Sequence, residues 1–465
     1  MGRPQSFERR QRITMWQIRI IVLGAALALL LSPRAVSARI WQVAADGSGD
    51  APTIQAGMDS ALAGDDVVLA PGTYTWTAHA PSPDTLAMVF MKSGVTLRSE
   101  AGASTTILDG ENVGRIVLCA DVGEVRIEGL TLQRGYGPVR SNDLAGGGGI
   151  CAFGSSRPAI ANCVIRNNSG FRGAGIQING GGAITNCEIL DNRGGTSGGG
   201  IYGHDLVVSH CRIVGNSTGG EGSGGGGLTI IGGSVVDCHF ESNWANGVFG
   251  AGGGAIQIWE QRVEIRRSTF LSNKVLAVIG NGIGAAINVR SGDCLVSECI
   301  FVNNQIRVGD GSVGFGVLAA ERAGLDVTGC TIIGNSTEGT SSTVGIELGP
   351  TSRGTVASTI IAWNRGGLPC RGSSLQFSCS NLYGNSGGDT LCGTDLGGNF
   401  SADPQFCGVD PAASLNLSLQ QDSPCAPGNH PAGSACGLIG ARPIGCEAVA
   451  IEQSTWGKVK TLYRR

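Results

Sequence analysis

Charged and aromatic residues are scarce in this chain of 465 residues, at 15% and 5%. With 41% apolar residues and so little charge, the chain does not have the composition of a disordered protein. The 78 glycines exclude an ordinary helical protein, because a glycine inside a helix costs about 0.5–1 kcal/mol relative to alanine. Collagen would need glycine at every third position and far more than 16 prolines. What remains is a long all-β protein with many tight turns.

No apolar run is long enough to span a bilayer comfortably; the one near the N-terminus covers Ile20–Leu31. A group of arginines precedes it, and Val36–Ala38 follows it with the small residues of a cleavage site. We interpret residues 1–38 as a secretory signal cut before Arg39. The protein is therefore expected to be secreted or displayed at the cell surface, with no integral membrane segment after signal removal.

Clustered basic residues are also missing. Without residues 1–38 the chain keeps 27 basic and 35 acidic residues, a net charge of −8. A nucleic-acid surface needs grouped cations, so we expect no nucleic-acid partner. The chain has no C-x-x-C motif, and its five histidines do not cluster in sequence. We therefore predict no metal site and no cofactor.

A repeat of 21–31 residues runs through the chain from Cys163 onward. Each repeat ends in an asparagine that follows an Ile, Phe or Leu by three residues. Five residues before most of these asparagines stands a Cys, Ser or Thr. The asparagines are Asn168, Asn192, Asn216, Asn243, Asn273, Asn304, Asn335, Asn364 and Asn385.

A second column of apolar residues alternates with the first, and a small-residue cluster, mostly Gly-Gly, precedes each member. Its members are Ile150, Ile176, Ile201, Leu228, Ile256, Ile287, Val317 and Ile346. Apolar residues often recur two positions later, which is typical of a short strand with one buried face. Each repeat thus holds two or three strands and no helix.

Repeats this short cannot bury their own apolar faces, so they must stack. Stacked strands lie about 4.8 Å apart, which turns each column into a line along the stack. The sequence predicts a parallel β-helix, a solenoid of about eleven or twelve coils with isoleucines inside and asparagines bonded amide to amide. We expect Asn243→Leu to destabilise the solenoid more than Asn364→Leu does, because Asn364 should lie near the end of the asparagine line.

The N-terminal region predicts an amphipathic helix over Thr53–Leu62, a strand at Val67–Ala70 and a turn at Pro71–Tyr74. This order resembles the N-terminal cap of pectin-lyase-like right-handed β-helix proteins, and Val95–Ser99 resembles their first coils. The resemblance implies a right-handed helix with a helical cap, and it is not specific for activity. Gly253–Ile256 paired with Phe240–Asn243 is similar to the repeats of chlamydial polymorphic outer-membrane proteins, which are surface adhesins.

The region 370–446 holds seven of the sixteen cysteines, which predicts a disulfide-closed C-terminal cap with one cysteine left over. The predicted organisation is residues 1–38 as signal peptide, 39–369 as β-helix with its N-terminal cap, 370–446 as last coil and Cys-rich cap, and 447–465 as a basic tail. The tail is either a sorting signal or a frayed terminus.

The cysteine column of the coils allows two interpretations. Cys163, Cys187, Cys211 and Cys238 fall on neighbouring coils, within reach of disulfide bonds. Ser268 and Thr359 take the same position in other repeats, so the position needs only a small and weakly polar residue. Stacked free thiols are favoured over vertical disulfides.

Ligand-binding candidates come from one outer row and from the segments between each asparagine and the next Gly-Gly. The row takes the third residue after each member of the second column: Phe153, Asn179, His204, Ile231, Trp259 and Arg290. Aromatic and guanidinium groups in a line can stack on and hydrogen-bond a sugar polymer. The segments supply Trp244 and Phe249, which are apolar for surface positions. For both sets, an ordinary solvated surface is the competing interpretation.

No catalytic residue is assigned. Three G-x-S-x-G matches lie in glycine-rich stretches without the strand and helix that a hydrolase needs, and Asp65-Asp66 fits a turn better than a glycosidase pair. The resemblance implies that β-helix lyases and hydrolases display several Asp, Arg or Lys on adjacent coils, and no such set is recognisable here. We expect a monomeric, non-catalytic, adhesin-like protein that binds a polysaccharide or a cell surface; the alternative is a polysaccharide lyase or glycoside hydrolase.

Overall fold

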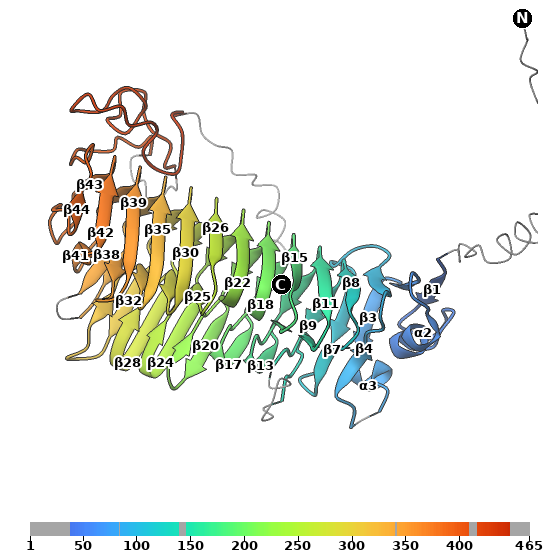
Figure 1. Cartoon of the computed structure of the whole chain (residues 1–465). Helices are drawn as coiled ribbons and strands as arrows, with labels where there is room; N and C mark the ends of the chain where they lie inside the picture. Colours follow the sequence, from blue (N-terminus) through green and yellow to red (C-terminus); the bar gives the residue numbers. More distant parts are fainter. Residues whose placement is uncertain (1–37, 83, 139–145, 340–341, 409–415, 447–465) are drawn as a thin grey trace, which may run out of the picture. The chain divides into compact units, whose positions relative to one another are not determined.

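The computed structural model of the protein describes residues 38–82, 84–138, 146–339, 342–408 and 416–446. All of the predicted signal except Ala38, and the whole basic tail 447–465, lie outside these ranges, so both stay predictions. The described residues from Ile40 onward form one compact unit. Its strands stack side by side along one direction (Figure 1).

The coils of the stack form four parallel ladders, which we name A, B, C and D in the order in which the chain passes through them; among the described residues, the coils at the two ends contribute no strand to ladder D. Ladder C is a separate 12-stranded sheet: β3 (Gly72–Thr75), β6 (Thr106–Asp109), β9 (Thr131–Gln133), β12 (Val164–Arg166), β16 (Glu188–Leu190), β19 (Arg212–Val214), β23 (His239–Glu241), β27 (Thr269–Leu271), β31 (Ile300–Val302), β36 (Thr331–Ile333), β40 (Ile360–Ala362) and β43 (Asn381–Tyr383).

Ladders A and B are joined by two long strands, β18 (Ile201–Ser209) and β22 (Leu228–Val236), which run through both. The other strands of ladder A are β4 (Ala87–Phe90), β7 (Arg115–Ala120), β10 (Ile150–Phe153), β14 (Ile176–Ile178), β25 (Ile256–Ile258), β29 (Ile287–Val289), β34 (Leu318–Ala320), β38 (Thr343–Leu348) and β41 (Leu368–Arg371). The other strands of ladder B are β1 (Ile40–Val43), β2 (Asp66–Leu69), β5 (Thr96–Ser99), β8 (Glu124–Glu128), β11 (Arg157–Ala161), β15 (Gly182–Thr185), β26 (Val263–Arg266), β30 (Gly292–Ser297), β35 (Ala323–Thr328), β39 (Arg353–Ala357), β42 (Leu375–Ser378) and β44 (Thr394–Asp395).

Ladder D is built from the segments that follow the asparagines. Its strands are β13 (Ser169–Arg172), β17 (Arg193–Ser197), β20 (Ser217–Gly220), β21 (Ser223–Gly224), β24 (Trp244–Gly252), β28 (Lys274–Ile283), β32 (Gln305–Val308), β33 (Gly314–Phe315) and β37 (Ser336–Thr337). From the sequence we expected loops in these segments, because glycines and polar residues obscure the alternation of buried and exposed side chains. Parallel pairing with the coil on either side makes them strands.

The isoleucine column is confirmed with one change of register. Ile150, Ile176, Ile201, Leu228, Ile256 and Ile287 follow one another in ladder A, and the next member is Leu318 rather than Val317. Both residues are fully buried, so hydrophobicity alone could not distinguish them. The shift moves by one residue the positions counted from this strand of ladder A, which matters for the site below.

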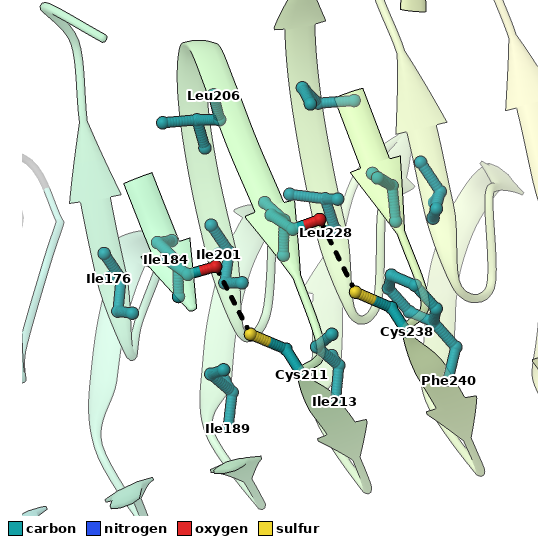
Figure 2. Packing of buried hydrophobic residues seen from close by; sticks show 14 of the residues in the cluster. Ile176, Ile184, Ile189, Ile201, Leu206, Cys211, Ile213, Leu228, Cys238 and Phe240 are labelled. Atoms are coloured by element: carbon teal, nitrogen blue, oxygen red, sulfur yellow. Dashed lines mark hydrogen bonds between the residues drawn. The ribbon is translucent and has the colours of Figure 1, made fainter. Parts of the chain in front are cut away.

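The core holds these apolar columns, and Figure 2 shows Ile189, Ile213 and Phe240 side by side within it. Phe240, Phe270 and Phe301 stack almost parallel, with ring centroids 5.0 and 4.7 Å apart. Cys211 and Cys238 point into the same core (Figure 2), and their thiols donate to backbone carbonyls of the preceding coil, as in the 3.4 Å contact of Cys211 Sγ with Ile184 O. The column cysteines are free thiols, as favoured.

The asparagine line is continuous from Asn168 to Asn385. Each side chain donates through Nδ2 to Oδ1 of the next asparagine, at 2.9–3.1 Å throughout. Asn364 lies one place before the end of the line, as expected, but it has asparagine neighbours on both sides. The line ends at Asn385, which donates to Asp389.

Among the described residues, two short helices lie near the N-terminal end of the stack. Helix α2 (Ile54–Ser60) lies within the predicted helix Thr53–Leu62, and the hydroxyl of Thr53 accepts from the amide of Ala56 and caps it. Its buried residues Ile54, Gly57 and Met58 face β1, β2 and β4. That this helix serves as the cap of the stack stays a prediction. The expected turn Pro71–Tyr74 is instead mostly strand β3, and α3 (Trp76–His79) follows it.

The C-terminal cysteines form the bonds Cys370–Cys392, Cys379–Cys436 and Cys407–Cys446. Cys425 is the cysteine left over; it is buried, and burial raises its pKa to about 12. The cap folds back onto the outer face of ladder C, where Ile300, Ile333 and Ile360 join its own apolar cluster. The predicted disulfide-closed end is confirmed.

Candidate functional site

The predicted outer row lies at the turn between ladders A and B. His204 and Ile231 are register partners, and Trp259 and Arg290 continue the row on the next two coils. The change of register to Leu318 adds Glu321, whose amide donates to Val289 O. We name His204, Ile231, Trp259, Arg290 and Glu321 the turn row. Sequence reasoning missed Glu321 because it counted from Val317.

Trp259 and Arg290 are in direct contact. The guanidinium carbon of Arg290 lies 4.6 Å from the centroid of the indole ring, a cation–π contact. On its other side Arg290 Nε lies 3.9 Å from Glu321 Oε2. One face of the indole is therefore occupied by Arg290. A ligand would therefore meet the turn row at a half-buried Trp259 side chain, not at an indole ring with both faces open.

A charged hollow of about 320 Å³ begins three residues beyond the turn row, on the outer face of ladder B. It extends over β26, β30, β35, β39 and β42, which lie side by side in Figure 1. We name it the charged groove and define it by six of its lining residues: Arg262, Asp293, Asp326, Arg353, Ser374 and Gln376.

An ion pair crosses the charged groove between coils that are not adjacent. Arg353 Nη2 lies 2.8 Å from Asp293 Oδ1, and the coil between them contributes Gly324. A Cβ atom at Gly324 would overlap Asp293 Oδ1, so this pairing depends on glycine there. Both side chains of the pair remain open to solvent, at 77% and 52% exposed.

Asp326 is held by Thr355 of the next coil. Its Oδ1 accepts from the Thr355 amide at 3.1 Å and from the Thr355 hydroxyl at 2.7 Å. Arg262, at the other end of the groove, forms no ion pair with any described residue. The groove thus presents two guanidinium groups, two carboxylates, an amide and hydroxyls over consecutive coils.

This set of charged residues on adjacent coils is what sequence reasoning looked for and did not find. Arg262, Asp293 and Arg353 each stand three residues before the core position of their strand, at Ile265, Val296 and Val356. The same position on the coil between is Gly324. Aligning the repeats on that core column and reading three residues back would have found the row. Only the fold shows that its charges meet across a glycine.

A second hollow, of about 600 Å³, lies on ladder B over β5, β8, β11, β15 and β18. Its floor is apolar and shallow, with Ala159, Ala183 and the exposed Val207. Glu124, Arg157 and Asp205 line it, at the positions three residues before the core that Arg262 and Asp293 occupy further along. Ladder B therefore carries charged rows and hollows over much of its length.

The two remaining candidates, Trp244 and Phe249, lie on β24 of ladder D and not with the turn row. Trp244 is 41% exposed and lines a hollow of about 260 Å³ with Lys274, Leu276, Gln305 and Arg307. Phe249 is 62% exposed and pairs in register with Ile279 of β28. The structure thus separates the five predicted residues into two groups on different ladders.

Among the described residues, no cluster of three or more His, Cys, Asp or Glu is arranged to hold a metal ion. Within the same ranges, no helix has the length and apolar character needed to cross a bilayer. Burial raises the pKa of the Cys119 and Cys294 thiols, which makes them poor nucleophiles.

Residues 111–270 match the family model described as right handed beta helix region. No curated protein matches the chain. Among solved structures, pectate lyase Pel9A is similar at 15% identity and a TM-score of 0.44, covering 88% of this chain and 98% of that one. The A-module of the mannuronan C-5 epimerase AlgE6 of Azotobacter vinelandii is similar at 17% identity and a TM-score of 0.30, covering 76% and 95%.

The parallel ladders and the matched region define a right-handed parallel β-helix protein. The right-handed parallel β-helix expected from the sequence is thereby confirmed. At such low identity and TM-score, neither solved structure carries an argument about activity. The finer resemblance to chlamydial repeats stays a prediction.

Proposed function

We propose that this protein is secreted or displayed at the cell surface and binds an extended polysaccharide along the charged groove of ladder B. The observation that carries the proposal is the array of Arg262, Asp293, Asp326, Arg353 and Gln376 over consecutive coils about 4.8 Å apart. A sugar residue has a similar length, so a chain lying along the stack meets a new donor or acceptor at each coil. The three disulfides of the C-terminal cap favour an extracytoplasmic location.

Binding without turnover is favoured because the carboxylates of Asp293 and Asp326 are bonded to other residues of the protein. One oxygen of Asp293 is paired with Arg353, and one oxygen of Asp326 accepts two bonds from Thr355. A general acid or base needs an oxygen aimed at the substrate, whereas these two are bonded within the protein. The turn row borders the groove, and Trp259 with Arg290 would bind the ligand at this edge.

The test is a screen of the mature protein against neutral and anionic polysaccharides, read for binding and for chain cleavage. Loss of a charge-assisted hydrogen bond of about 1.5–3 kcal/mol predicts that Arg353→Ala weakens binding by roughly 10- to 100-fold. The melting temperature should hardly change, because an exposed ion pair contributes about 0–1 kcal/mol. Arg307→Ala, an exposed arginine of ladder D, is the matched control. Unchanged affinity in Arg262→Ala, Arg353→Ala and Trp259→Ala would remove this face from consideration.

A polysaccharide lyase or glycoside hydrolase is the second candidate, because Asp293 and Asp326 stand on adjacent coils of one outer face. Paired carboxylates on one face are what glycosidic-bond cleavage requires. The same screen separates the two functions. Product that disappears in Asp326→Asn while binding persists would establish the enzyme, and binding with no product in any polysaccharide supports the non-catalytic function.

A further inference from the structure

Four large apolar side chains stand exposed on two neighbouring strands of ladder D. Val248 and Phe249 of β24 are 44% and 62% exposed, and Val278 and Ile279 of β28 are 55% and 57% exposed. We name these four residues the apolar ridge. A contiguous exposed apolar patch is typical of a surface that binds another protein segment, a membrane or a ligand.

The local geometry shows that the ridge does not belong to the core. Residues of a strand packed on one face alternate between buried and exposed. Here two consecutive residues are exposed on each strand, and Phe249 pairs in register with Ile279. Both strands therefore project from the coils at this point, at the lower edge of the stack in Figure 1.

Acidic residues flank the ridge on both sides. Gly220 pairs with Gly247, which places the exposed Glu221 beside Val248 on the preceding coil. Gly309 donates to Ala277 O, which places the exposed Asp310 beside the ridge on the following coil. The cations of the neighbouring strands β28 and β32, Lys274 and Arg307, lie nearer the strand starts around the Trp244 hollow. The matching partner is apolar and basic.

Two other occupants fit this charge pattern less well. If two copies met ridge to ridge about a two-fold axis, acidic flanks would face acidic flanks, and like charges there oppose association. An anionic membrane would likewise repel Glu221 and Asp310.

We propose that the apolar ridge is the docking site of this chain's own C-terminal segment, residues 456–465. That segment carries Trp456, Val459, Leu462 and Tyr463 together with four cations, Lys458, Lys460, Arg464 and Arg465. It therefore supplies apolar side chains for the ridge and positive charges for Glu221 and Asp310.

The place where the described chain ends makes this contact reachable. Gly440 and Ala441 bond to Ser358 and Thr331, at or beside ladder C, and Cys446 follows five residues later. Ladder D comes next after ladder C in these coils, and β28 directly follows β27, which is separated from β36 along ladder C by one strand, β31. The nine residues between Cys446 and Trp456 span up to about 30 Å when extended, more than one or two coil spacings and half a strand.

Trypsin cleavage of the full mature protein tests the proposal, because Lys458 and Lys460 are cut fast only when the segment is undocked. We expect cleavage to be about tenfold faster in Phe249→Ser/Ile279→Ser than in the wild type, as for an undocking equilibrium shifted by ~1.4 kcal/mol. Val207→Ser, which removes a 48% exposed apolar side chain from ladder B, is the matched control and should be unchanged. Equal rates in the wild type and the ridge variant would overturn the proposal.

A charge variant keeps the test independent of any folding defect in the ridge variant. Glu221→Gln/Asp310→Asn should raise the cleavage rate about threefold, and added salt should raise the wild-type rate in the same direction. No change in either measurement counts against the docking. Concentration-dependent dimers that vanish in Phe249→Ser/Ile279→Ser would assign the ridge to a second copy. Phe249-dependent sedimentation with phosphatidylglycerol vesicles would assign it to a membrane. Either result overturns the proposal.

Discussion

Replacing Asn243 by leucine removes the middle of the buried asparagine line. The Asn243 amide donates to Ile213 O at 2.8 Å and to Asn273 Oδ1 at 2.9 Å. Its Oδ1 accepts from the backbone N and from Nδ2 of Asn216, both at 3.1 Å. Leucine has a similar volume, so the change deletes four hydrogen bonds while leaving their fully buried partners in place.

The expected cost follows from those four bonds. At a net of about 0.5–1.5 kcal/mol each, Asn243→Leu should lower the free energy of unfolding by roughly 2–6 kcal/mol. The upper part of this range applies because the backbone N–H of Asn216 and the Ile213 carbonyl lose their side-chain partner away from water. Asn385→Leu deletes the same number of bonds at the end of the line, where the exposed Ser386–Gly388 stretch admits water. Its cost should be no more than about half as large.

Urea unfolding followed by circular dichroism measures both variants, and hydrogen exchange of the Asn216 and Asn192 amides reports the local effect. Asn385 replaces Asn364 as the comparison, because Asn364 is bonded on both sides. Equal losses in Asn243→Leu and Asn385→Leu, or a loss below about 1 kcal/mol in Asn243→Leu, would refute the argument that the line stabilises the stack through its buried amide bonds.

Three further outcomes follow from individual contacts. Reductant should abolish hydrogen-exchange protection in residues 370–446 while the coils from 150 to 364 keep theirs, since the described disulfides lie in the cap; uniform loss would contradict this. Burial raises the pKa of Glu347 above 4.5, so the folded state binds the proton more tightly and stability falls as pH rises through that range. Glu347→Gln should therefore raise the melting temperature more at pH 7 than at pH 4, and an equal shift at both would refute it. Gly324→Ala should separate Asp293 from Arg353 at a cost below about 1 kcal/mol, with no further loss when Asp293→Asn is already present; additive losses would argue against the contact.

The predictions succeeded where a residue contacts mainly the equivalent residues of the neighbouring coils. The asparagine line, the inward thiols and the isoleucine column could all be predicted, because a stacked repeat places equivalent residues against each other. The thiols of Cys163 and Cys211 are buried for the same reason as the isoleucines beside them. Ladder D was not predicted as strand, since its glycines and polar residues hide the alternation of buried and exposed side chains.

The site could be predicted less well than the fold. Trp259 and Arg290 were placed on neighbouring coils from the sequence, but the stacking of the guanidinium on the indole depends on side-chain conformations that spacing does not specify. The charged groove was missed because its members share a column with Gly324 and pair across two coil spacings.

The sequence by itself determined that the chain is a β-helix, where its coils repeat and which side chains form its core, because burial acts on each repeat separately and leaves a periodic record. The tertiary structure alone decided the register at Leu318, the pairing of Asp293 with Arg353 and the exposure of Phe249 and Ile279. These features depend on contacts between residues of different coils, and the sequence of a single repeat does not specify those contacts.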